Sequence, residues 1–191
     1  MILGSHNSWS YLPPRHWWMR PFAFMARCQS KTIQEQYELG VRCFDLRVRT
    51  DRYAYPHVYH GSMEYKIFPT QLKRDLKFLH DKGDCFVRVI HEARTRSQYQ
   101  PNYIRGFREF CAWAQATFPD IDFWCGRNLY NYKVDYDFSP VIPTCDENYS
   151  SVISPALDDW WPWLYARLNN KMILAKGTDK EILLIDFVNI K

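Results

Sequence analysis

The alternation of short apolar runs with helical patterns most strongly constrains the fold of this chain. The apolar runs predict seven strands, at residues 2–5, 41–48, 56–61, 85–91, 121–125, 171–175 and 181–187. Helical patterns are expected between them, at residues 33–39, from Pro69 to Gly83, from Asn102 to Pro119, and at 158–169. This order is typical of a parallel sheet with crossover helices and predicts an α/β fold.

Local end signals support the helix predictions. Thr32 and Glu35 have the spacing of a capping box, and Pro69 and Gly83 suit the first turn and the C-cap of a helix. Residues 126–155 are rich in Tyr, Asn, Asp and Pro without a sustained period, so we expect a long loop there.

Composition limits the class of protein. With 191 residues and 47% hydrophobic content, one sizeable core is expected, and residues 1–191 are interpreted as a single domain. A formal net charge of +4 is too small to indicate a nucleic-acid partner. No apolar run approaches the roughly 20 residues of a membrane span, and no signal peptide is visible. We therefore expect a cytoplasmic or peripherally membrane-bound protein. A monomer is also expected.

The six cysteines form no C-x-x-C pair, which argues against a zinc ribbon or a thioredoxin-type site. Cys43 and Cys85 lie in apolar strand-like runs and are expected to be buried thiols.

Ionisable residues gather at the predicted strands. They are His6, Asp45, Arg47, His60, His91 and Asp186. In a parallel α/β barrel the carboxyl ends of the strands hold the active site. Two histidines, an arginine and carboxylates are the groups needed to cleave a phosphodiester by general acid–base catalysis. Simpler interpretations stay open: a structural histidine, a buried Asp45–Arg47 ion pair, or Asp186 as a loop cap.

Four segments carry a family resemblance. The motifs Gly4-Ser5-His6-Asn7-Ser8, Gln36-Tyr37-Glu38-Leu39-Gly40-Val41-Arg42-Cys43-Phe44-Asp45-Leu46-Arg47, Tyr59-His60-Gly61 and Leu184-Ile185-Asp186-Phe187-Val188-Asn189 resemble the X-domain of phosphatidylinositol-specific phospholipase C. The resemblance implies a compact, distorted TIM (β/α) barrel and a two-histidine phosphodiesterase that forms a cyclic inositol phosphate.

The resemblance also implies roles for individual residues. His6 would be the general base toward the inositol 2-hydroxyl, with Asp186 fixing its tautomer. His60 would be the general acid for the leaving diacylglycerol oxygen. Arg47 would stabilise the charged transition state, and Asp45 would orient the groups around it.

Further positions concern metal and substrate. Calcium-dependent members carry ligand carboxylates where this chain has Arg47 and His91, so the resemblance is to the bacterial metal-independent type, and no metal or cofactor is expected. Glu92, next to His91, would be the ligand if the alignment slips by one residue. The predicted substrate-binding residues are Asn7, His91, Arg88 and Lys176. Metal-independent relatives carry an aspartate at the position of Asn7, so Asp45 is the candidate helper carboxylate for His60.

Residues 9–27 interleave aromatic and basic side chains directly after His6. Such a rim suits contact with a lipid interface through Trp17 and Trp18; the alternative is that both pack into the core. Two other functions compete with the phospholipase hypothesis. One is a glycerophosphodiesterase-like hydrolase, and the other is a non-catalytic module that binds phospholipid headgroups.

Overall fold

The computed structural model describes residues 1–51, 53, 55–92, 101–128, 134–135, 145–147, 161–177 and 179–190. The strands are β1 (Ile2–Ser5), β2 (Cys43–Thr50), β3 (Pro56–His60), β4 (Met63–Glu64), β5 (Phe86–His91), β6 (Asp122–Asn128), β7 (Val134–Asp135), β8 (Cys145–Glu147) and β9 (Ile182–Ile185). The α-helices are α1 (Ile33–Glu38), α2 (Pro69–Lys82), α3 (Pro101–Thr117) and α5 (Pro162–Lys176), and a 3₁₀ segment, η1, spans Trp17–Met25.

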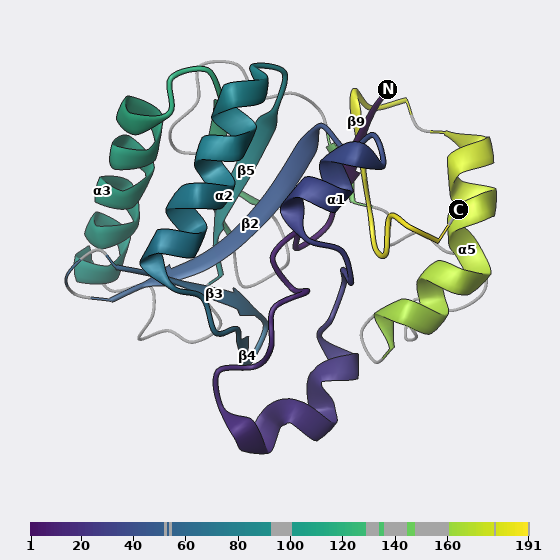
Figure 1. The fold of residues 1–191 in the computed structure, drawn as a ribbon, viewed down its shortest axis with the longest axis horizontal. Helices are drawn as coiled ribbons and strands as arrows, with labels where there is room; N and C mark the ends of the chain where they lie inside the picture. Colours follow the sequence, from purple (N-terminus) through teal and green to yellow (C-terminus); the bar gives the residue numbers. More distant parts are fainter. Residues whose placement is uncertain are drawn as a thin grey trace.

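The strands form one sheet in the order β7-β6-β5-β2-β1-β9-β8, with the β3–β4 hairpin attached to β2. Strands β6, β5, β2, β1, β9 and β8 pair in parallel, while β7 and β3 are antiparallel to their neighbours. In Figure 1, α2 and α3 stand side by side over the β5–β2 part of the sheet, and α5 lies beyond β9. The mixed α/β class predicted from the sequence is confirmed.

The expected closed barrel is not what the structure shows. Within the described residues, β7 and β8 are the two edges of an open sheet and do not pair with each other. The segment expected to be a loop, 126–155, contributes the end of β6 and both edge strands; its other residues lie outside the described part of the chain.

The end of the chain departs from the prediction in another way. The expected strand at 171–175 is wrong, because these residues continue α5 from Pro162 to Lys176. Pro162 does not interrupt this helix but occupies its first turn, where a missing N–H costs nothing. Of the helix predicted at 158–169, residues 158–160 lie outside the described part. Gly177, with φ 66°, ends α5, and only Ile182–Ile185 forms the last strand.

Local chemistry explains the helices that were predicted correctly. The Thr32 side chain accepts from the Glu35 amide, and the Glu35 carboxylate accepts from the Thr32 amide, so the capping box of α1 is complete. Helix α2 begins at Pro69, ends at a left-handed Gly83, and buries Leu72, Leu76 and Leu79.

The core lies on both sides of the central parallel strands. Its largest fully buried side chains include Trp9, Phe44, Leu46, Leu76 and Phe107. Cys43 and Cys85 are buried, as expected. Gly4 lies between β2 and β9, and a Cβ there would collide with Leu184 and press on Cys43. A larger residue at this position would therefore force Leu184 to move.

Of the aromatic segment at residues 9–27, Trp9 is part of the core, but Trp17 and Trp18 are not. Segment η1 buries none of its residues, and Trp17 and Trp18 are 78% and 55% exposed. In Figure 1 this dark purple segment protrudes at the bottom of the view, beyond β4, where the chain leads after β1. Across the described residues, no helix combines the length and apolarity needed to cross a membrane.

Candidate active site

The predicted catalytic residues come from neighbouring parts of the sheet. His6 directly follows β1, and Asp186 directly follows β9, the parallel neighbour of β1. Asp45 and Arg47 lie two residues apart on β2, the other neighbour of β1, and therefore face the same side. His60 is the last residue of β3. Parallel pairing of β1, β2 and β9 thus brings segments from both ends of the chain together at the carboxyl ends of these central strands.

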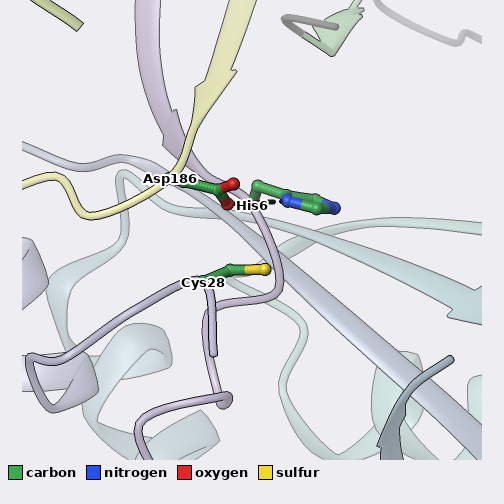
Figure 2. A group of neighbouring side chains, drawn as sticks. All are labelled: His6, Cys28 and Asp186. Atoms are coloured by element: carbon green, nitrogen blue, oxygen red, sulfur yellow. Dashed lines mark hydrogen bonds and ion pairs between the residues drawn. The ribbon is translucent and has the colours of Figure 1, made fainter. Parts of the chain in front are cut away.

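His6 is held by a carboxylate. Its Nδ1 lies 2.8 Å from Oδ1 of Asp186, and both side chains are nearly buried (Figure 2). The backbone at Asp186 is also held in place, because Asn170 of α5 donates to the Asp186 carbonyl at 2.8 Å. The ionised carboxylate accepts from Nδ1–H, which leaves Nε2 as the basic nitrogen of the ring. This is the contact that the family resemblance implies.

His60 is held by a backbone carbonyl instead. Its Nδ1 donates to the Ala26 carbonyl at 2.9 Å and lies 3.6 Å from the Cys28 sulfur. Burial, together with positive charge on His6 and Arg47, lowers the pKa of His60 to about 4. Its ring meets that of His6 edge-on, with centroids 5.5 Å apart. The site therefore holds two adjacent imidazoles with different partners.

Asp45 is the centre of a buried charge network. Oδ2 accepts from Arg47 Nε at 2.7 Å and from the Asn7 amide at 3.0 Å. Oδ1 lies 3.5 Å from Arg88 Nη1, and Oδ2 lies 4.0 Å from His6 Nε2. Burial raises the pKa of Asp45, but Arg47 and Arg88 outweigh it, so the net pKa is well below its ordinary value. Asp45 is an anion that orients Arg47.

Glu92 connects Arg47 to the turn after His60. One carboxylate oxygen lies 3.6 Å from Arg47 Nη1, and the other accepts from the Gly61 amide at 3.0 Å. Arg49 donates to the carbonyls of Glu92 and Gly61. These contacts fix the hairpin that presents His60 relative to the guanidinium of Arg47.

Two of the predicted substrate-binding residues, Asn7 and Arg88, are buried near Asp45. Asn7 is buried in the left-handed region, at φ 44°, which asparagine tolerates, and its carboxamide has no hydrogen-bond partner among the described residues. Arg88 is 1% exposed and lies behind Asp45, so it supports the network from within.

Two predicted residues lie apart from this cluster. His91 packs against Phe107 of α3, with ring centroids 5.1 Å apart, while the adjacent Glu92 is the residue that reaches Arg47. Lys176 is exposed at the end of α5. The next residue, Gly177, lies near Met1, which is at the opposite end of β1 from His6. The site also does not pair Asp45 with His60; the Ala26 carbonyl is at His60 instead.

Several residues of the site were not predicted. Gln29 donates to the carbonyls of His6 and Ile185 and accepts from the Val188 amide, so it ties β1 to the end of β9. Cys28 places its sulfur near both histidines. Among the described residues, His6, Cys28 and Asp186 are the one group whose ligand atoms lie close enough, within 4.8 Å of one another, to hold a metal ion.

Comparisons with known proteins give the same fold. No family model and no curated protein matches the sequence. Among solved structures, the phosphatidylinositol-specific phospholipase C of Listeria monocytogenes matches with a TM-score of 0.63 and 15% identity, over 97% of this chain and 87% of that one. A variant of the Staphylococcus aureus enzyme matches with a TM-score of 0.66 and 15% identity, over 97% and 84%. A further structure, from work on modulating the membrane binding of the S. aureus enzyme, gives 0.62 and 15%, over 97% and 85%.

The chain thus has the fold of bacterial phosphatidylinositol-specific phospholipases C over nearly its whole length. The resemblance predicted from the sequence is confirmed at the level of the fold.

Proposed function

We propose that this protein is a metal-independent phosphodiesterase that cleaves phosphatidylinositol between glycerol and phosphate. The observation that carries the proposal is the pair of edge-on histidines, 5.5 Å apart, each with its Nδ1 engaged by a protein acceptor. With Nδ1 engaged, Nε2 is the atom through which each ring exchanges a proton. Two such rings beside an arginine suit an in-line displacement at phosphorus.

In the first step, His6 takes the proton of the inositol 2-hydroxyl as its oxygen forms a bond to phosphorus. Asp186 stabilises the resulting imidazolium. The bond from phosphorus to the diacylglycerol oxygen breaks, and His60 gives a proton to that oxygen. Arg47, held by Asp45, stabilises the charge on the phosphoryl oxygens. The product is a cyclic phosphate, which water opens by the reverse proton transfers.

The low pKa of His60 is compatible with a role as the acid. In the free protein, burial keeps this ring neutral near pH 7. A bound phosphodiester brings a negative charge next to the ring, which favours its protonated form. His60 would therefore gain its proton on Nε2 when substrate binds. The hydrogen bond from Nδ1 to the Ala26 carbonyl would keep the ring in the same orientation.

Metal independence is supported by Arg47. Its guanidinium is 2.7 Å from Asp45 and 3.6 Å from Glu92, so it supplies positive charge among the carboxylates that would otherwise attract a cation. The carboxamide of Asn7 is buried without a hydrogen-bond partner among the described residues, so it would bind an inositol hydroxyl only if substrate binding exposes it.

The activity can be tested by ³¹P NMR. Phosphatidylinositol vesicles are incubated with the protein in excess chelator, and the expected result is a cyclic inositol phosphate signal followed by the acyclic monoester. Glycerophosphodiesters serve as the competing substrates. Hydrolysis of those alone supports the glycerophosphodiesterase alternative, and vesicle binding without any new signal supports a non-catalytic module. Activity only after calcium is supplied contradicts metal independence.

Segment η1 supports a membrane contact. Trp17, Trp18, Phe22 and Phe24 are all about half exposed or more, and Arg20 is exposed among them. Amphipathic aromatic and basic side chains favour the headgroup region of a bilayer. The S. aureus protein has been solved in a study of its membrane binding, which is consistent with this role.

The double variant Trp17→Ala/Trp18→Ala should weaken vesicle binding by about tenfold or more, because two indoles lose their interfacial contact. Cosedimentation with anionic vesicles measures this. Trp113→Ala on α3, another exposed tryptophan, is the matched control and should bind as the wild type does. Equal binding by all three proteins contradicts a role for η1.

A further inference from the structure

Cys28 has no part in the proposed reaction, yet it lies beside the proposed base. A ring nitrogen of His6, the sulfur of Cys28 and a carboxylate oxygen of Asp186 are all within 4.8 Å of one another. Figure 2 shows the three side chains converging, with the sulfur directed toward the space beside the His6–Asp186 pair. All three are buried, and His6 and Asp186 retain only 5% and 6% exposure.

The backbone holds this group together. The Cys28 amide donates to Ser10 Oγ at 3.0 Å, and the Cys28 carbonyl accepts from the Phe187 amide at 2.6 Å. The second bond ties Cys28 to the residue directly after Asp186. The next residue, Gln29, ties the strand ends that carry His6 and Asp186. The three donors are therefore preorganised rather than brought together by long, free side chains.

The donor set selects the metal. One imidazole nitrogen, one thiolate sulfur and one carboxylate oxygen form the mixed set that zinc accepts, with water as a fourth ligand. Calcium binds oxygen donors and would leave the sulfur and nitrogen unused. Zinc bond lengths place tetrahedral ligand atoms roughly 3.4–3.8 Å apart, so side-chain shifts of about 1 Å close the site.

We infer that Zn²⁺ inhibits this protein by binding His6, Cys28 and Asp186. Catalysis in the proposed function needs no metal, and here the ion acts against it. Zinc on Nδ1 of His6 replaces the hydrogen bond to Asp186 and moves the ring proton to Nε2. A ring that carries its proton on Nε2 cannot accept one from the attacking hydroxyl. The Cys28 thiol releases its proton to solvent as the metal binds.

Metal binding is tested first, independently of activity. Titration of the full chain with Co²⁺ should give a thiolate-to-cobalt charge-transfer band at one ion per chain, and Zn²⁺ should abolish it. Cys28→Ser should lose the band. Cys85→Ala, which removes another buried thiol, should keep it. A band that persists in Cys28→Ser overturns the site.

Inhibition is tested second and rests on the proposed function. Zn²⁺ should inhibit phosphatidylinositol cleavage, excess chelator should restore it, and the inhibitory concentration should rise about 100-fold or more in Cys28→Ser. This estimate follows because loss of an outer-shell partner alone costs 10–100-fold in metal affinity. Each variant is compared with its own activity without zinc. Equal inhibition of both proteins, or activation by zinc, contradicts the inference.

A measurement on the wild type covers the case in which Cys28→Ser does not fold. In ¹⁵N spectra of the histidines, saturating Zn²⁺ should move the proton of His6 from Nδ1 to Nε2. An unchanged His6 tautomer overturns the inference. A chain that binds zinc at His6 but cleaves no phosphodiester refutes the proposed function while leaving the metal site in place.

Discussion

The two histidines of the site are held in different ways, although they occupy adjacent positions. On the β1–β9 side, His6 has a carboxylate partner, and the hydrogen bond from Nδ1 to Asp186 favours the charged ring. On the β3 side, His60 has a carbonyl partner at Ala26, which fixes the tautomer without adding a negative charge. Burial then lowers the pKa of His60 to about 4. In the proposed mechanism, this difference makes His6 the ring that accepts a proton and His60 the ring that gains its proton when substrate binds.

The comparison predicts that both rings are essential. His6→Ala and His60→Ala should each lower kcat/KM toward phosphatidylinositol by roughly 10²–10⁴-fold, because each loses one proton-transfer step. His57→Ala is the control, since it lies on the same strand as His60 but binds Glu64. A folded His60→Ala protein with near wild-type turnover contradicts the assignment of the acid.

In the proposed mechanism, Arg47 assists both histidines by stabilising the phosphoryl group of the substrate. Arg47→Gln should lower kcat by roughly 10²–10³-fold, the range seen when one donor to a developing oxyanion is removed. Arg42→Gln is the control, because Arg42 is paired with Asp84 outside the site. An Arg47→Gln protein that loses affinity for substrate but not turnover would limit Arg47 to ground-state binding.

In the proposed mechanism, Asp186 is a positioning residue, because it contacts His6 and acts through it. Asp186→Asn should lower kcat/KM by about 10–100-fold with little change in thermal stability. Without the carboxylate that accepts from Nδ1–H, ¹⁵N spectra of His6 should show more of the Nε2–H tautomer. A lower rate with an unchanged His6 tautomer would show that Asp186 has only a structural role.

The smallest expected effect concerns stability. The pKa of His60 is about 4 in the folded protein and about 6.5 in the unfolded chain. As pH falls from about 6.5 to 4, only the unfolded chain takes up this proton, so the fold is destabilised by at most about 1.4 kcal/mol per pH unit. His60→Gln should show a shallower loss of Tm over this range, whereas His16→Gln, an exposed control, should match the wild type. Equal slopes in all three proteins contradict the lowered pKa.

Much of this architecture could be predicted where local chemistry decides it. The capping box of α1 and the Pro69 and Gly83 ends of α2 act within a few residues, so sequence alone located both helices. The apolar run 171–175 was misassigned, because a short run of this kind suits a strand or a buried helix face equally well. Whether the sheet closes depends on edge strands β7 and β8, which are only two and three residues long and lie in a segment without clear periodicity.

The site shows the same division. Side chains with distinctive chemistry, such as His6, Arg47 and Asp186, could be proposed from their motifs and strand positions. The partner of His60 could not, because a backbone carbonyl at Ala26 has no residue-type signal. The position of Cys28 likewise depends on hydrogen bonds to Ser10 and Phe187, residues distant from it in the sequence. Motif spacing alone could not decide between His91 and Glu92. Adjacent residues of a strand face opposite sides of the sheet, so a slip of one residue in the alignment exchanges the two.

The division of labour between the two histidines can be tested most directly with leaving groups of different basicity. The measurement is kcat/KM of His6→Ala and His60→Ala on an inositol phosphodiester with an alkyl leaving group and on one with a nitrophenyl leaving group, which departs without protonation. The account predicts that His60→Ala loses roughly 10²–10⁴-fold on the alkyl substrate but only about tenfold or less on the nitrophenyl substrate, while His6→Ala loses heavily on both. Equal losses of the two variants on both substrates would contradict the assignment of His6 as base and His60 as acid.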